Sequence, residues 1–354
     1  MSLVHAHRIV FFGMNGPLSR VPLNRLVTSP LKPLLVIEGL SAPDPKTSRR
    51  PQYHFERGRS RPWASATSSP PIDIARSTSS GASPLSLREI ALGSGIDFIC
   101  TSDANGARVR ARIRAANADA LLVAGFPHLL SADVLALSKK GGLNVHPGAL
   151  PEERGPAPVF WALKRGQTRF TYTIHMLDVG EDTGDIITSG MTDECDGLAM
   201  STILEQIAKR ATPSLIQGAR ALLEGDLVRH RQPVNTEATS RAAIDAKAAT
   251  TAPSRRPRPA FRDGLIDRTR PAKEVFTFVR GCAETHSLFV ESGGDRFFIR
   301  SAYRYDETGT LGFDYVLLGD HLYVRCDPGF VDLELKAEGA LFGSEYTTPT
   351  GGVL

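Results

Sequence analysis

An amide, an imidazole and a carboxylate stand near one another in the middle of this sequence, and together they could carry out a group transfer. Asn144 and His146 are two residues apart at the end of a short apolar run that Pro147 closes, and Asp182 follows in a glycine-rich acidic segment. Residues two apart in a strand point to the same side of a sheet. We therefore expect Asn144 and His146 to project into one space.

Each of these three side chains could serve one part of a reaction in which an amine attacks a carbonyl group. The Asn144 amide can donate a hydrogen bond to the developing oxyanion. The His146 imidazole can donate or accept a proton near neutral pH. The Asp182 carboxylate can fix the tautomer of that imidazole, raise its pKa and pass protons through a water.

Each residue also has a more ordinary structural interpretation when it is taken alone. Asn144 could cap a turn, His146 could be a structural histidine, and Asp182 could be a solvated turn residue. The joint occurrence of the three, with Arg154-Gly155 between them, favours a catalytic role. The acidic residues around Asp182 do not have the spacing of a calcium loop, so no metal is expected.

The elements expected to position these residues alternate between strands and helices. Apolar, β-rich runs predict strands at 8–12, 34–37, 97–100, 119–124, 143–145 and 171–177. Helical patterns cover 18–26, 87–92, 107–116, 132–138 and 201–223, and Pro213 is expected to kink or split the last helix. This alternation predicts an α/β fold with a doubly wound, mostly parallel, Rossmann-like sheet.

A second, smaller domain is expected after this sheet. Residues 230–260 are rich in Ala, Thr, Arg and Pro and predict a linker. A helix at 272–280 is followed by short apolar segments that predict strands at 288–291, 297–300, 315–318, 322–326 and 331–335. We expect a catalytic domain at 1–229, a linker at 230–260 and an OB-like β-barrel domain at 261–354.

The segment 41–86 interrupts the first domain and differs in composition. It is crowded with Pro, Ser and Arg and lacks aliphatic periodicity, so it predicts a mostly irregular insertion. Between residues 46 and 61 it carries six Lys or Arg and one Glu. Such a stretch is either a solvated loop or an arm that contacts phosphate groups.

Bulk composition narrows the class of protein. The 354 residues are 41% hydrophobic and carry a formal net charge of +4, too weak alone to indicate a nucleic-acid partner. The four cysteines form no C-x-x-C pair, which disfavours a zinc site or a disulfide framework and fits a reducing compartment. No apolar run could span a membrane, so we expect a cytoplasmic protein without a membrane or a stable protein partner.

The motif Asn144-Val-His-Pro147 and the segment Leu177-Asp-Val-Gly-Glu-Asp-Thr-Gly-Asp185 resemble the formyltransferase family that uses 10-formyltetrahydrofolate. The resemblance covers most of the chain and is most like the methionyl-tRNA formyltransferases within that family. It implies formyl transfer with 10-formyltetrahydrofolate as co-substrate, no metal cofactor, and catalytic roles for Asn144, His146 and Asp182.

The same resemblance implies that a segment after one core strand helps to hold the pterin. The residues expected to bind this co-substrate are Gly125, Phe126, Leu129, Leu130, Val179, Gly180 and Glu181. Ordinary core packing is an equally good explanation for the two leucines. His128 and His175 have no evident partner in the sequence and are expected to be structural histidines.

Two departures from the methionyl-tRNA formyltransferases bear on the amine acceptor. The segment 41–86 replaces an Arg-Pro-Ala-Gly-Arg-Gly-like loop, and residues from 273 onward contain seven Lys or Arg against thirteen Asp or Glu. An acidic barrel is a poor electrostatic match for a polyanion.

The leading expectation is nevertheless formyl transfer to the amino group of initiator methionyl-tRNA. The nearest alternative keeps the donor and changes the acceptor to a small amine, such as an amino sugar nucleotide, a modified ornithine or a carrier-bound amino acid. Less favoured are hydrolysis of the formyl donor and a non-catalytic RNA-binding protein.

Overall fold

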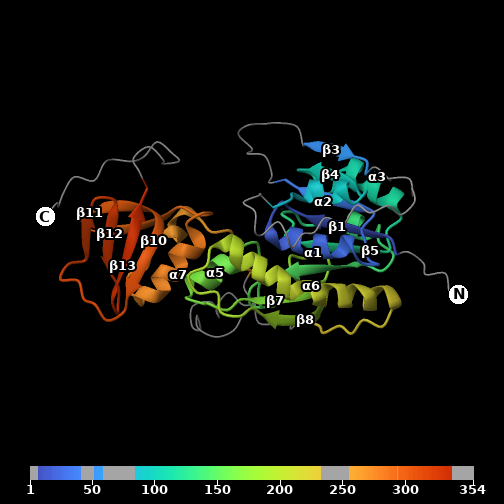
Figure 1. Cartoon of the computed structure of the whole chain (residues 1–354). Helices are drawn as coiled ribbons and strands as arrows, with labels where there is room; N and C mark the ends of the chain where they lie inside the picture. Colours follow the sequence, from blue (N-terminus) through green and yellow to red (C-terminus); the bar gives the residue numbers. More distant parts are fainter. Residues whose placement is uncertain (1–6, 41–51, 59–83, 233–254, 293, 337–354) are drawn as a thin grey trace, which may run out of the picture. The chain divides into compact units, whose positions relative to one another are not determined.

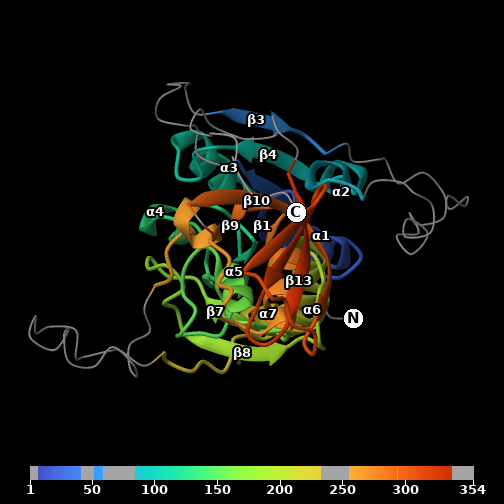
Figure 2. The ribbon, with the colours of Figure 1, turned by 90° about the vertical axis from the view of Figure 1, so that its left-hand side faces the viewer.

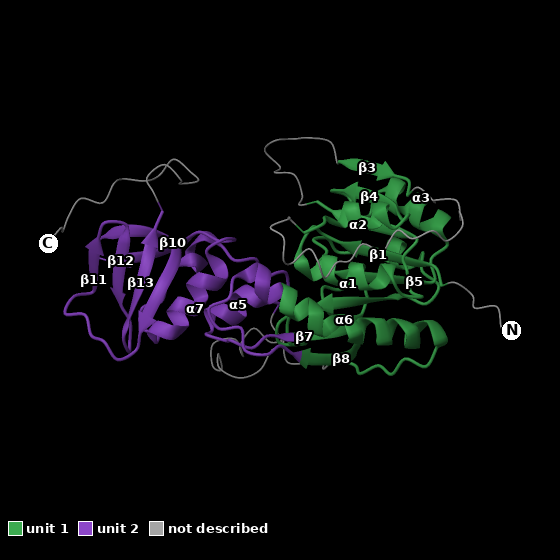
Figure 3. Cartoon of the chain, in the orientation of Figure 1, with its two compact units in different colours: residues 1–154, 172–190, 205–253 green, residues 155–171, 191–204, 254–354 purple. Residues whose placement is uncertain are grey.

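The computed structural model describes residues 7–40, 52–58, 84–232, 255–292 and 294–336. The chain divides into two compact units (Figure 3): unit 1 comprises residues 1–154, 172–190 and 205–253, and unit 2 comprises residues 155–171, 191–204 and 254–354. The domain boundaries that we infer from the sequence, after residues 229 and 260, stay a prediction.

An eight-stranded sheet has the strand order β3-β4-β2-β1-β5-β6-β7-β8. Its parallel strands are β1 (Ile9–Gly13), β2 (Leu35–Gly39), β4 (Asp97–Thr101), β5 (Ala120–Ala124) and β6 (Gly142–His146). Strand β3 (Tyr53–Glu56) is antiparallel at one edge (Figure 1 and Figure 2), and β7 (Thr171–Met176) and β8 (Ile186–Met191) complete the other. The predicted mostly parallel, Rossmann-like sheet is confirmed.

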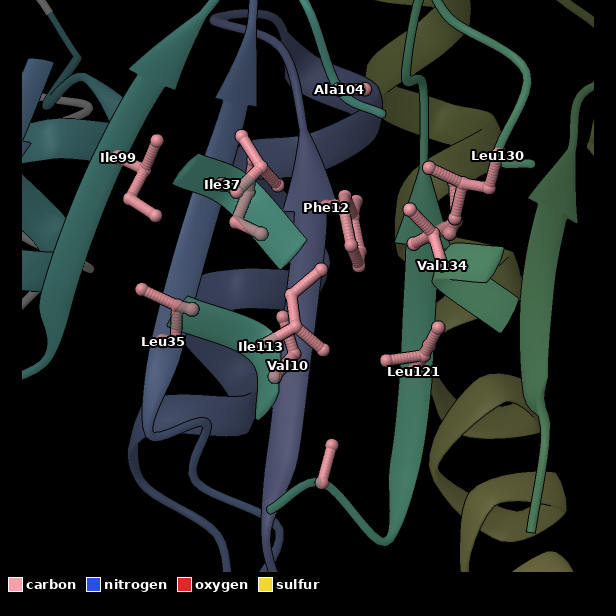
Figure 4. Close-up of a cluster of buried hydrophobic side chains, with 13 residues drawn as sticks. Val10, Phe12, Leu35, Ile37, Ile99, Ala104, Ile113, Leu121, Leu130 and Val134 are labelled. Carbon is pink, nitrogen blue, oxygen red and sulfur yellow. The ribbon is translucent and has the colours of Figure 1, made fainter. Parts of the chain in front are cut away.

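The central strands form because their sequences suit burial on both faces. All five residues of β1 and of β5 are buried, as expected for near-continuous apolar runs in a parallel sheet covered by helices. One face carries a hydrophobic cluster (Figure 4) that includes Val10, Phe12, Leu35, Ile37, Ile99, Ile113, Leu121, Leu130 and Val134. The cluster includes Leu121 and Val123 of β5, the strand that pairs with β6.

The helices are α1 (Pro17–Val27), α2 (Leu87–Gly93), α3 (Ala107–Ala116), α4 (Ala132–Leu135), α5 (Pro158–Lys164), α6 (Met200–Glu224) and α7 (Ala272–Cys282). A capping box between Ser86 and Glu89 begins α2. The expected split of the longest helix does not occur, since α6 runs through Pro213. Its buried apolar face, which includes Ile207 and Leu215, stabilises the helix on both sides of the missing backbone donor.

Strand β3 lies within the segment 41–86, which we expected to be mostly irregular. Its side chains alternate: Tyr53 and Phe55 pack against the hydrophobic cluster, and Glu56 pairs with Arg88. The expectation of a mostly irregular insertion did not include this four-residue strand. The parts of the insertion at 41–51 and 59–83, with most of its basic residues, lie outside the described residues.

Unit 2 contains a second sheet with the order β11-β12-β13-β10-β9. The strands are β9 (Leu288–Ser292), β10 (Asp295–Asp306), β11 (Tyr315–Leu318), β12 (His321–Arg325) and β13 (Phe330–Leu335), after a short 3-10 helix at Phe261–Gly264. All pairings are antiparallel, and α7 packs against β10 and β13. The expected small C-terminal β-domain is confirmed as a curled, five-stranded half-barrel. Within the described residues no helix combines the length and apolarity that crossing a bilayer requires.

Candidate active site

The carboxyl end of β6 presents Asn144 and His146 on one face of the sheet. Between them, Val145 is buried on the opposite face. Strand β7 runs antiparallel beside β6, with His175 opposite Asn144 and Thr173 opposite His146. Directly opposite residues on adjacent strands share a face, so β6 and β7 together provide a row of polar side chains.

Asp182 reaches this row from the loop between β7 and β8. Its Oδ2 atom lies 3.4 Å from His146 Nδ1, and its Oδ1 atom lies 3.4 Å from Asn144 Nδ2 and 3.5 Å from His175 Nε2. The structure therefore brings together the three residues that the sequence singled out. It also adds a fourth polar residue, His175.

His146 is held at both ring nitrogens. Its Nε2 atom lies 2.7 Å from the Glu153 carbonyl oxygen, and its Nδ1 atom faces the Asp182 carboxylate. Burial lowers the pKa of His146, but the hydrogen bond and charge of Asp182 and the Glu153 carbonyl outweigh burial, so the pKa is raised above its usual value. Because both partners are acceptors, a doubly protonated imidazolium satisfies them at the same time.

This raised pKa predicts a specific dependence of stability on pH. A group whose pKa is higher in the folded chain stabilises it fully below the unfolded pKa, about 6.5 for His, and that contribution is lost as pH rises through the folded pKa. His146→Gln should therefore make the free energy of unfolding less dependent on pH in this window. Denaturant unfolding at a series of pH values would measure it, and identical pH dependence in the two proteins would contradict the assignment.

His175 is a site residue that sequence reasoning missed. Its Nδ1 atom donates to the Met176 carbonyl at 2.8 Å, which leaves Nε2 to accept from Asn144 Nδ2 at 3.0 Å. This contact directs the NH2 group of Asn144, rather than its oxygen, toward His175 and Asp182. The sequence offered no partner for His175, which we expected to be a structural histidine; the structure supplies Asn144 and the Met176 carbonyl as partners. His128, by contrast, binds the Leu40 carbonyl at 2.7 Å, away from this row.

His175→Leu should lower kcat about tenfold to a hundredfold, because Asn144 loses the acceptor that orients its amide. The change places an apolar side chain of similar size at a buried position, so the fold should survive. Steady-state kinetics and far-UV circular dichroism would measure both effects. His54→Leu, in the exposed part of β3, is the matched control, and equal activity of the two variants would contradict the orienting role.

The loop that carries Asp182 has its own internal support. The Asp178 carboxylate accepts hydrogen bonds from Thr183 Oγ1 at 2.8 and 2.7 Å and from Gly180 N at 3.2 Å. Asp182 itself has a φ of 56°, a left-handed conformation that is uncommon outside glycine and is found at functional sites. Val179 is 68% exposed at the start of this loop.

The residues proposed to hold the pterin occupy different environments. Gly125 follows β5 with a φ of 61°, and a Cβ there would lie 3.2 Å from Ser19 Oγ, so the position favours glycine. Phe126 packs edge-on against Phe12 at a centroid distance of 5.2 Å. Leu129 is exposed, whereas Leu130 belongs to the buried cluster (Figure 4). Core packing therefore explains Leu130 directly, and Leu129 remains a candidate wall.

No group of three His, Cys, Asp or Glu side chains that could hold a metal ion occurs among the described residues. The groups that these residues offer are a hydrogen-bond donor, a buried imidazole with a raised pKa, and a carboxylate. That combination suits an acyl or formyl transfer, in which an oxyanion and a mobile proton both appear.

Comparison with known proteins also indicates formyl-transfer chemistry. A family model described as formyl transferase matches residues 89–217, which contain all four site residues. A methionyl-tRNA formyltransferase from Anaeromyxobacter dehalogenans is 32% identical over 171 residues, covering 48% of this chain and 50% of the relative. One from Chlamydia pneumoniae is 27% identical over 277 residues, covering 76% and 81%. The chain thus aligns with about half the length of the first of these relatives.

Two solved structures have the same fold over nearly the whole chain. WlaRD, a sugar 3N-formyl transferase, matches with a TM-score of 0.57 and 13% identity, covering 95% of this chain and 100% of that chain. An N-formyltransferase from Helicobacter canadensis matches with a TM-score of 0.54 and 13% identity, covering 94% and 100%. At this level of identity the likeness establishes the fold alone.

Proposed function

We propose that the chain transfers a formyl group from 10-formyltetrahydrofolate to a primary amine, as a divergent member of the formyltransferase family that is most like the methionyl-tRNA formyltransferases. The observation that carries this proposal is the convergence of Asn144, His146 and Asp182 at the end of β6. All three lie inside the segment that the family model matches.

We assign to Asn144 and His146 the role of stabilising the oxyanion of the tetrahedral adduct. The co-substrate supplies an electrophilic formyl carbon. One N–H of Asn144 is committed to His175 at 3.0 Å, whereas the bond of its amide to Asp182 is long at 3.4 Å. The second N–H is thus free to turn to an oxyanion, and the buried imidazolium of His146 adds positive charge where water does not screen it.

We assign to Asp182 the role of the base that accepts the proton of the attacking amine. Both ring nitrogens of His146 face protein acceptors, so His146 fits a fixed cation better than a direct base. The Asp182 side chain is 12% exposed against 4% for His146, and it can reach the amine directly or through a water. The amine loses this proton as its bond to carbon forms, and the departing nitrogen of the donor gains a proton as its bond breaks.

We assign the pterin to the loop after β5 and the start of the loop after β7. Gly125 offers backbone groups without side-chain obstruction, Gly180 lies in the second loop with its N–H bound to Asp178, and Leu129 and Val179 are exposed apolar side chains. The remaining candidates are Phe126, which packs against Phe12, Leu130, which is buried in the hydrophobic cluster, and Glu181. Open α/β sheets commonly bind ligands at this carboxyl edge.

Methionyl-tRNA is the acceptor that the sequence relatives favour. The relatives at 27% and 32% identity are both methionyl-tRNA formyltransferases. A specific observation favours a small amine instead. From residue 273 onward most of the basic side chains are paired with acids: Lys273 with Asp196, Arg296 with Glu291, Arg300 with Glu334, Arg304 with Asp332, and Arg325 with Asp314. Paired cations attract phosphate weakly.

A formylation assay at several salt concentrations separates these acceptors. The chain is mixed with 10-formyltetrahydrofolate and initiator methionyl-tRNA, and formyl-methionine and tetrahydrofolate are measured. Salt-sensitive formylation of the tRNA would support it as acceptor. Turnover only with an amino sugar nucleotide would replace that acceptor with a small amine, and formate release without any amine would indicate a hydrolase.

A further inference from the structure

Gln232 is a buried glutamine that lies 50 residues after Asp182 in the sequence and contacts the loop that carries it. The residue is 6% exposed. Its Nε2 atom donates to the carbonyl oxygens of Asp182 at 2.9 Å and Gly184 at 2.7 Å. Its Oε1 atom accepts from Arg154 Nε at 3.0 Å and Arg154 Nη2 at 2.5 Å. Both hydrogens and both lone pairs of the amide are therefore used.

The backbone before Gln232 is attached to the same loop. His230 and Ile186 exchange two backbone hydrogen bonds, each 2.8 Å long, in an isolated antiparallel bridge. Residues 230–232 therefore run alongside residues 182–186. Beyond this bridge, where the loop forms no regular strand, the side chain of Gln232 supplies the hydrogen bonds to the loop carbonyls.

Arg154 connects this contact to the histidine of the site. The residue before it, Glu153, accepts the Nε2–H of His146 through its carbonyl oxygen, and its carboxylate accepts from Ala149 N at 3.0 Å. The interactions form a closed ring: His146 to Glu153, along the chain to Arg154, then Gln232, Asp182 and His146 again. A ring of this kind fixes the spacing of its members better than any single bond.

The conformation of Asp182 shows why such support is needed. Its φ of 56° lies in the left-handed region, which costs free energy for a residue with a side chain and persists only where the surroundings impose it. Gln232 binds the carbonyl of Asp182 itself and that of Gly184, on either side of Thr183. It thereby restrains the backbone on which the carboxylate is mounted.

We propose that Gln232 is a positioning residue for the formyl-transfer site. The side-chain amide of Gln232 forms hydrogen bonds to the Asp182 loop and to Arg154, and these hold the Asp182 carboxylate against His146. This inference rests on the proposed function for its effect on turnover. Its effect on geometry is independent of turnover, because the distance between Asp182 and His146 also determines the titration of His146. The two consequences can be measured separately.

The test compares Gln232→Met, which keeps the length of the side chain without its hydrogen bonds, with Gln217→Met. Gln217 is exposed on α6 and serves as a matched control. In Gln232→Met the His146 pKa, followed by imidazole NMR without any acceptor, should fall by at least about half a unit as the carboxylate moves away. With 10-formyltetrahydrofolate and methionyl-tRNA, kcat should fall about tenfold to a hundredfold, while the donor KM stays within about twofold.

An unchanged His146 titration together with unchanged kcat in folded Gln232→Met would overturn the proposal. If that variant does not fold, Gln232→Asn provides the same test, since its amide is one methylene shorter and cannot reach both carbonyls and Arg154. If even the wild-type chain turns over no donor, the proposed function fails. The His146 titration then still decides whether Gln232 positions Asp182.

Discussion

Replacing Asp182 with Asn should lower kcat for formyl transfer by about three orders of magnitude. The substitution keeps the shape of the side chain but removes the charge that supports the His146 imidazolium and the carboxylate that takes the proton of the amine. The donor KM should change by no more than about threefold, because Asp182 is assigned to the chemical step and not to the pterin.

The pH profile separates this role from a general loss of structure. In the wild-type chain, burial lowers the pKa of His146, but the hydrogen bond and charge of Asp182 more than offset this effect and raise it. The variant should therefore show a lower His146 pKa as well as a lower kcat. Asp226→Asn, at an exposed position after α6, controls for the loss of one negative charge in unit 1. A variant of Asp182 with near-normal kcat would contradict the assignment of the proton to this carboxylate.

Replacing Asn144 with Ala should lower kcat about a hundredfold to a thousandfold, the usual cost of removing one oxyanion donor. His175 and Asp182 each lose the neighbouring amide of Asn144, but His175 Nδ1 keeps the Met176 carbonyl and Asp182 Oδ2 keeps His146 Nδ1. The folded structure and donor affinity should therefore persist. Asn144→Asp, nearly the same size but without an N–H donor, should fail to restore activity.

Single-turnover kinetics with saturating donor measure this step without product release. Titration of the folate donor and the midpoint of thermal unfolding show whether binding and folding are retained. The double variant of Asn144 and Asp182 should lose less than the product of the two single losses, because both residues act on one transition state. Wild-type single-turnover rates in Asn144→Ala would exclude Asn144 from the oxyanion site.

Much of the fold could be predicted from the sequence because its signals are local. The buried strands β1 and β5 are continuous apolar runs, and α3 follows a clear helical pattern bounded by Gly106 and Asn117. The proximity of Asn144 and His146 follows from their spacing in one strand. The role of Asp182 rested on its motif, and the structure places it within 3.4 Å of both.

The remaining features depend on contacts that one sequence does not display. The register of β6 against β7 places His175 beside Asn144, and nothing in the spacing of the two residues specifies that register. Gln232 acquires its partners from segments 50 and 78 residues away. Strands β3 and β8 were missed because they are short and mix polar with apolar residues. The helix α6 is not split at Pro213 because tertiary packing outweighs local propensity.

The most direct test of the account follows the formyl carbon itself. The chain is mixed with 10-formyltetrahydrofolate labelled with carbon-13 at the formyl group, and with initiator methionyl-tRNA or an amino sugar nucleotide as amine. The account predicts that the label moves into a formamide on one amine with equimolar release of tetrahydrofolate, and that Asp182→Asn nearly abolishes the transfer. A label that stays on the donor, or appears as formate at the same rate with and without amine, would contradict formyl transfer.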